Sequence, residues 1–246
     1  MEIDHTRRRL LTTFAAAPAG VLFVMPALAA TPARDRTPDV AIAPIRFAVS
    51  REGQQIGSHT VRFQREGADL IVEIDIELDV RFAFVTVYRY RHTNREVWRD
   101  GRVVAIDART DDNGEGYTVT ARGTAEGLTV EGREGRVNVP ADTLSTSYWN
   151  PATVRQSKLI DTQHGRIAEV TTRSLGFRAV QTPAGTVRGE CWRVSGDLDL
   201  DVCYAENGAW IGLDFEARGS RISYARADRP DGESSSQRTG DARGQG

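Results

Sequence analysis

Lysine is almost absent from this chain, and neither sign of charge is in excess. Lys158 is the only lysine, so arginine supplies nearly all of the 32 basic residues, and 34 acidic residues bring the net charge to -2. The basic excess that is typical of nucleic-acid-binding proteins is missing. The composition therefore predicts no nucleic-acid partner, while 39% apolar residues suffice for a folded core.

Motifs for metal and phosphate chemistry are also missing. Beyond the N-terminal segment the histidines are His59, His92 and His164, and none stands in a spacing typical of zinc sites. The chain has no G-x-S-x-G nucleophile motif and no glycine-rich phosphate loop of the Walker or Rossmann kind. The sequence therefore predicts no metal site and no cofactor.

Cysteine is scarce, and the spacing of the two that exist is informative. Cys191 and Cys203 lie symmetrically about a predicted turn at Gly196-Asp197, so paired strands would place them opposite each other. In an oxidising compartment this favours a disulfide. Two reduced, buried thiols are the alternative, and the spacing excludes a redox C-x-x-C motif.

The first 29 residues have the pattern of an export signal. The run T-R-R-R-L-L (6–11) precedes an apolar stretch that ends in small residues. The pair Arg7-Arg8 resembles the twin-arginine signal, which the export machinery reads as an address, and an ordinary secretory signal is the alternative. We expect cleavage near Ala29 and a periplasmic protein. No cysteine follows this site to carry a lipid, so we expect no stable membrane anchor after cleavage.

The rest of the chain is predicted to contain one domain. Residues 30–43 have the composition of a linker, and residues 228–246, with no large apolar side chain, that of a disordered tail. Residues 44–227 between them show a period of two. In 70–80, for example, apolar residues alternate with acidic ones. This alternation predicts strands with one buried and one solvated face.

Turn signals recur every 8–12 residues without helical spacers, as in sandwiches and barrels. The pair Asp100-Gly101 predicts a two-residue hairpin in which Trp98 faces Val103 and Val97 faces Val104. The fold class expected is all-β, an antiparallel meander that forms a curved sheet, half-barrel or barrel.

One segment, 144–165, departs from this pattern. Asn150 before Pro151 is a typical helix start, and Gly165 is a typical residue after a helix end. The sequence predicts one short inserted helix over about 151–162, which would plug or cap the concave face of the sheet.

Polar and aromatic side chains concentrate in the same segment. Ser147, Asp161 and His164 are the candidates for a hydrolase-like triad, although capping, packing and a turn explain these residues without catalysis. The predicted ligand-binding residues are Tyr148, Trp149 and His164, with Tyr88, Tyr90 and His92 contributing from the sheet wall. We expect the first three to approach the largest apolar cavity, and a core plug at Trp149 is the alternative.

Several blocks carry a family resemblance. They are FAVSREGQQIG (47–57), VYRYRHTNREVWRDG (87–101), SYWNP (147–151), DTQHG (161–165) and GLDFEARGS (212–220). Together they resemble a family of exported bacterial proteins that is catalogued only as a domain of unknown function. The resemblance implies a periplasmic, all-β single domain and supplies no activity, cofactor or catalytic residue. At the level of fold alone, the meander with an insertion is similar to periplasmic half-barrels that carry lipids or lipoproteins.

These observations favour a non-enzymatic binding or accessory protein for an apolar or amphipathic, lipid-like ligand. Two other hypotheses remain. One is a structural partner in a cell-envelope complex, and the other is a hydrolase-like enzyme that uses the segment 144–165.

Overall fold

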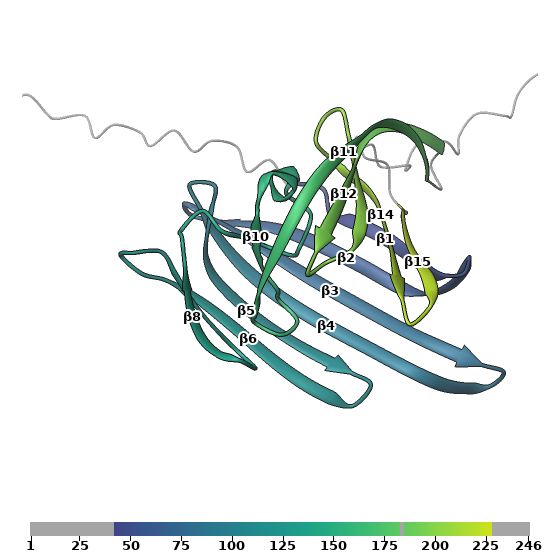
Figure 1. Cartoon of the computed structure of the whole chain (residues 1–246), viewed down its shortest axis with the longest axis horizontal. Coiled ribbons are helices and arrows are strands. Elements are labelled where there is room, and N and C mark those ends of the chain that lie inside the picture. Colours follow the sequence, from purple (N-terminus) through teal and green to yellow (C-terminus); the bar gives the residue numbers. More distant parts are fainter. Residues whose placement is uncertain (1–41, 183–184, 228–246) are drawn as a thin grey trace, which may run out of the picture. The chain divides into compact units, whose positions relative to one another are not determined.

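The computed structural model describes residues 42–182 and 185–227, and these residues form one sheet of 15 strands (Figure 1). The predicted export signal (1–29), nearly all of the predicted linker (30–43) and the predicted tail (228–246) lie outside the described residues. They remain predictions.

The strands follow one another along the chain with short connections. The first eight are β1 (Ile45–Arg51), β2 (Gln54–Glu66), β3 (Asp69–Phe82), β4 (Val85–Arg99), β5 (Arg102–Asp112), β6 (Glu115–Gly123), β7 (Leu128–Gly132) and β8 (Gly135–Val139). The others are β9 (Leu144–Ser145), β10 (Lys158–Ile160), β11 (Ile167–Thr182), β12 (Gly185–Gly196), β13 (Leu200–Ala205), β14 (Trp210–Ala217) and β15 (Ser220–Arg226).

The sheet consists of two meanders, β1 to β8 and β9 to β15, which are joined by the pairing of β1 with β15 in the middle of the sheet. Its order runs from β8 down to β1, then to β15 and down to β9. Every pair is antiparallel except β9 with β10. No pairing joins the two edge strands, β8 and β9, within the described ranges, so the sheet is curved but not closed. The predicted fold class is confirmed.

Strand β3 shows why the alternating pattern folds this way. Val72 is buried in the core, while its neighbour Glu73 is exposed and pairs with Arg95 of β4. Farther along the same outer face, Asp79 accepts hydrogen bonds from Arg91 at 2.7 Å and Arg89 at 3.3 Å. Cross-strand pairs of opposite charge thus cover the solvated face, as predicted.

The hairpin between β4 and β5 agrees with the sequence except at one position. Asp100 and Gly101 both have positive φ, which the two-residue turn requires. Trp98 faces Val103 as predicted, but the prediction for Val97 is wrong, because a β-bulge between Val97 and Trp98 shifts its partner to Ala105.

The predicted helix is much shorter than 151–162. A 3-10 helix, η1, spans only Pro151–Arg155, and the side chain of Asn150 caps it by accepting a hydrogen bond from the backbone N–H of Ala152 at 3.0 Å. Leu159 and Ile160 are consecutive and both fully buried, which a helix on a surface cannot provide but a strand between two neighbours can. They lie in β10, between β9 and β11.

Gly165 also has a different role from the predicted one. It lies in a turn with φ 80°, and its backbone N–H donates to the carbonyl of Asp161. A Cβ at this position would lie 2.5 Å from the Cα of Gly132. The glycine therefore permits the close contact of this turn with the end of β7.

The disulfide prediction is confirmed. Cys191 and Cys203 face each other across β12 and β13 and form a disulfide. No helix in the described ranges is long and apolar enough to cross a membrane.

The segment 144–166 lies against the inner face of the sheet. Trp149 packs edge-on against Phe63 of β2 and Trp98 of β4, with ring centroids 5.3 Å and 4.9 Å away. Ser145 donates a hydrogen bond to Glu96 of β4 at 2.6 Å. The segment thus fills one part of the concave interior and leaves another part open.

Candidate functional site

The open part of the interior contains two adjoining cavities, which we call the two lobes. A larger lobe of about 510 Å³ and a smaller lobe of about 330 Å³ share Ile76, Gln163, Phe215 and Tyr224 in their walls. A volume of this size is typical of small-molecule sites.

The larger lobe is predominantly apolar. Its walls come from the inner faces of β2, β3, β4, β14 and β15, where alternate residues are aliphatic or aromatic. They include Ile56, Leu78, Val80, Val87, Tyr88, Tyr90 and Ile222. The hydroxyl of Tyr90 is buried without a hydrogen-bond partner in the described chain.

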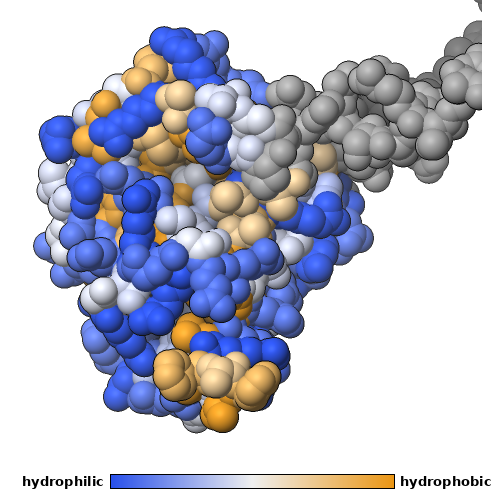
Figure 2. Space-filling model, turned by 90° about the vertical axis from the view of Figure 1, so that its right-hand side faces the viewer, coloured by the Kyte–Doolittle hydropathy of each residue, from blue (hydrophilic) through white to orange (hydrophobic). Residues whose placement is uncertain are grey.

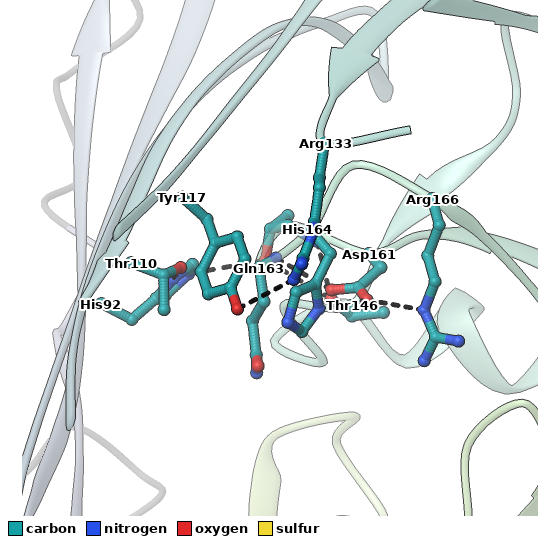
Figure 3. Close-up of polar contacts among 10 residues, drawn as sticks. His92, Thr110, Tyr117, Arg133, Thr146, Asp161, Gln163, His164 and Arg166 are labelled. Atoms are coloured by element: carbon teal, nitrogen blue, oxygen red, sulfur yellow. Dashed lines mark hydrogen bonds and ion pairs between the residues drawn. The ribbon is translucent and has the colours of Figure 1, made fainter. Parts of the chain in front are cut away.

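The smaller lobe ends at a polar loop, residues 161–166 (Figure 3). The Asp161 carboxylate accepts hydrogen bonds from the backbone N–H of Gln163 at 2.8 Å, from His164 Nδ1 at 3.0 Å and from Arg166 Nε at 3.1 Å. Burial alone would raise the pKa of Asp161, but these bonds outweigh it and hold the pKa below its usual value. A buried carboxylate therefore fixes a histidine and an arginine at the cavity wall.

Further contacts fix the side chains around the Asp161 carboxylate. The His164 ring packs edge-on against Tyr117 at 4.9 Å, and the Tyr117 hydroxyl accepts a hydrogen bond from Arg133. Gln163 extends away from the Asp161 carboxylate in Figure 3 and lines both lobes. Arg166 uses only Nε for Asp161, and its terminal nitrogens donate to no described residue.

His59 is the most unusual side chain of the smaller lobe. It is buried among Phe47, Trp210 and Tyr224, and neither ring nitrogen has a hydrogen-bond partner in the described chain. Burial, followed by the nearby His92, lowers its pKa to about 3. The neutral ring therefore offers one donor and one acceptor that the protein leaves unused.

His92 has partners instead. Its Nδ1 lies 2.8 Å from the hydroxyl of Thr110, and its Nε2 lies 3.5 Å from that of Thr162. Burial lowers the pKa of His92 to about 4, although Asp161 acts in the opposite direction. His92 is therefore neutral and holds the segment 144–166 against β4 and β5.

The structure brings most of the predicted ligand-binding residues to the interior. Tyr88 and Tyr90 line the larger lobe, and Tyr148 and His164 line the smaller one. His92 lines only a small neighbouring recess. Trp149 lines neither lobe, because its ring is held between Phe63 and Trp98. The predicted approach to the largest apolar cavity is therefore wrong for Trp149, and Tyr148 and His164 reach only the smaller lobe.

The candidate triad is only partly assembled. Asp161 and His164 are hydrogen-bonded, but no hydrogen bond joins Ser147 to His164 in the described chain. The Ser147 hydroxyl lies 2.8 Å from that of Ser145, which donates to Glu96. Ser147 thus belongs to a separate buried network.

That network was missed by sequence reasoning. Glu96 is 0% exposed and also accepts hydrogen bonds from Asn94 at 2.9 Å and from the Trp98 indole at 2.8 Å. The signal was available, because positions 94 and 96 share the parity of His92 and Trp98 and therefore the inner face. No comparable pattern marked Gln163 or Arg166. Among the described residues, no group of three or more histidines, cysteines or acidic residues could hold a metal ion.

The comparisons with known proteins agree with this fold. A family model described as Domain of unknown function (DUF6134) matches residues 47–227. The chain belongs to this family. The DUF6134 chain is also similar to the crystal structure of a β-barrel-like protein of domain of unknown function DUF1849 from Brucella abortus. The TM-score is 0.52 and the identity 7%, over 75% of this chain and 95% of that one. This likeness concerns the fold alone. No curated protein matches the sequence significantly.

Proposed function

We propose that this DUF6134 protein is exported to the periplasm and binds an amphipathic, lipid-like ligand in the two-lobed cavity without catalysing a reaction. The observation that carries the proposal is the polarity of the cavity. One lobe is walled mainly by aliphatic and aromatic side chains, with Arg51, Asp112, Gln163 and Arg218 as its polar members. The other contains Arg166, His164 and the unpaired nitrogens of His59, together with the acidic side chains of Asp161, Asp199 and Glu216.

The proposal assigns one part of the ligand to each lobe. The apolar chain lies along Leu78, Val80 and Ile222, where it replaces water that has few polar partners. The polar head lies at the 161–166 loop, where the terminal nitrogens of Arg166 are available to an anionic group. A head group with a hydroxyl or carboxyl also satisfies His59.

Export is supported by the sequence and is compatible with the disulfide. The pair Arg7-Arg8 and the apolar run after it have the pattern of an export signal. The bond between Cys191 and Cys203 is of the kind that persists in oxidising compartments. The hydrolase hypothesis has less support, since Ser147 is hydrogen-bonded to Ser145 rather than to His164.

A cavity-filling variant tests the proposal. Leu78→Trp adds a ring to the larger lobe, whereas Glu77→Trp adds the same ring one residue away, on the solvated face of β3. We expect native mass spectrometry to find a co-purified amphiphile in the unmodified protein and in Glu77→Trp but not in Leu78→Trp. Anilinonaphthalene sulfonate is a dye with apolar rings and an anionic group. In titrations it should bind the unmodified protein and Glu77→Trp but not Leu78→Trp.

The controls separate loss of the cavity from loss of the fold. Both variants should show the circular dichroism of the unmodified protein. If Leu78→Trp is folded and binds the dye and the amphiphile as well as Glu77→Trp does, the larger lobe does not hold the ligand. The absence of any dye binding by the unmodified protein would equally rule the proposal out.

A further inference from the structure

The hairpin between β3 and β4 extends beyond the rest of the sheet (Figure 1). The last pair of β2 with β3 is Gly57 with Leu78, and the last pair of β4 with β5 is Tyr90 with Asp112. Beyond these pairs β3 and β4 continue for several residues, paired with each other, to a two-residue turn at 83–84. We call residues 81–87 the hairpin tip.

The hairpin tip is apolar and exposed to solvent. Phe84 is fully exposed, and Phe82, Val85 and Val87 are 78%, 64% and 54% exposed. Figure 2 shows the resulting apolar patch at the lower end of the face in view. Most large exposed hydrophobic residues of the described chain lie here. Such a cluster on the surface of a folded protein indicates a binding surface.

The stretch of chain that contains the hairpin tip is positively charged, although the whole chain has a net charge of -2. Residues 79–91 contain three arginines and one aspartate, which gives a local net charge of +2. Arg81 is exposed directly beside Phe82 and makes no ion pair within the described chain. An apolar end followed by arginine is the arrangement that anionic lipid surfaces bind.

The size and shape of the hairpin tip do not suit a second copy of this chain. Its exposed apolar area is on the order of 500 Å², whereas each partner of a stable protein interface buries about 800 Å². The turn also projects as a narrow end rather than a flat face. A bilayer accepts such an end without matching its shape, because hydrocarbon chains rearrange around it.

We propose that the hairpin tip inserts into the surface of a lipid bilayer that contains anionic lipids, with Phe82 and Phe84 among the acyl chains and Arg81 at the headgroups. Docking in this position has a consequence for the cavity. Val87 belongs both to the hairpin tip and to the wall of the larger lobe. The larger lobe therefore lies next to the docked bilayer surface, which would let a ligand pass between them without crossing bulk water. This consequence rests on the proposed function, but the insertion itself does not.

Vesicle flotation tests the insertion. The exported protein, isolated after cleavage near Ala29, is mixed with vesicles of phosphatidylcholine and phosphatidylglycerol in equal parts, or of phosphatidylcholine alone. We expect the double variant Phe82→Ser/Phe84→Ser to bind the mixed vesicles about a hundredfold more weakly than the unmodified protein. Arg81→Glu should weaken binding to the mixed vesicles but not to phosphatidylcholine. The apolar run of the export signal is absent from every variant, so it cannot mask the contribution of the hairpin tip.

Phe177→Ser is the matched control, because Phe177 is 52% exposed but lies on β11, under Arg188. It should bind vesicles like the unmodified protein. Equal flotation of the double variant and this control would overturn the proposal. So would a concentration-dependent dimer that the double variant loses, because a second copy would then cover the hairpin tip. Vesicle flotation of Leu78→Trp keeps the two proposals apart, since this variant should lose the co-purified amphiphile but bind the mixed vesicles like the unmodified protein.

Discussion

Replacing Glu96 by glutamine should destabilise the fold by about 2–4 kcal/mol, because the side chain is an acceptor for three donors at once. The change keeps the shape and volume of the side chain. Glu96 is fully buried, and its Oε1 accepts from Asn94 and Ser145 while its Oε2 accepts from Trp98.

The magnitude follows from these contacts. A glutamine has one acceptor oxygen and one NH₂ group, so in either orientation the NH₂ faces the N–H of Trp98 or of Asn94. One hydrogen bond to a charged or polar acceptor is lost, and one buried N–H is left unpaired at a cost of about 1–3 kcal/mol. For a domain of this size each kcal/mol lowers the melting temperature by about 2–4 °C.

Urea unfolding followed by tryptophan fluorescence measures the effect, with Glu73→Gln as the control. Glu73 is exposed on the same sheet, so its substitution should change the free energy of unfolding by less than about 0.5 kcal/mol. A Glu96→Gln protein as stable as Glu73→Gln would refute the reasoning, because the three donors would then not depend on the carboxylate.

Three further predictions follow from residues already described. Denaturing alkylation of the protein as isolated should find no free thiol, and replacing Cys191 and Cys203 by serine should cost about 3 kcal/mol of stability. Trp149→Ala should cost about 3–5 kcal/mol, as for a core ring, and leave dye binding by the folded protein unchanged. Stability should fall as pH decreases, because the folded pKa values of His59 and His92, about 3 and about 4, lie below the unfolded value and the unfolded chain therefore binds more protons. The loss begins near pH 6.5 and reaches about 2 kcal/mol per histidine at about pH 5. Thermal melts between about pH 6.5 and about pH 5 measure this loss of stability. His59→Phe should remove the part of the pH dependence that His59 causes.

The sequence predicts those features that depend on neighbours along the chain. The alternation in β3, the Asp100-Gly101 turn and the symmetric placement of Cys191 and Cys203 all concern residues that meet their partners through a short connection. Two-residue periodicity is also sufficient to assign the solvated faces.

What the sequence did not predict depends on distant contacts. Leu159 and Ile160 form a strand because β9 and β11 lie on either side, and nothing within 151–162 shows this. Trp149 is partly buried and is held against the core by rings from β2 and β4 rather than by its own segment. The lobes of the cavity require the inner faces of strands from both ends of the chain, so their lining could not be assigned from local patterns.

The pairing of β1 with β15 has a consequence for how the chain folds. Every other pairing joins strands that are close in sequence, but Phe47 faces Arg226, and closing a loop of that length costs about 4–5 kcal/mol in chain entropy. The segments 45–139 and 144–226 can therefore each form their hairpins early. The pairing of β1 with β15, which joins the two segments, is expected to form last because it has the longest sequence separation. Since β1 and β15 lie side by side while β8 and β9 are free edges, a chain in which residue 227 is linked directly to residue 44 and which is opened at 140–143 keeps every pairing and makes all of them local. Such a permuted chain should reach the same structure faster than the natural one.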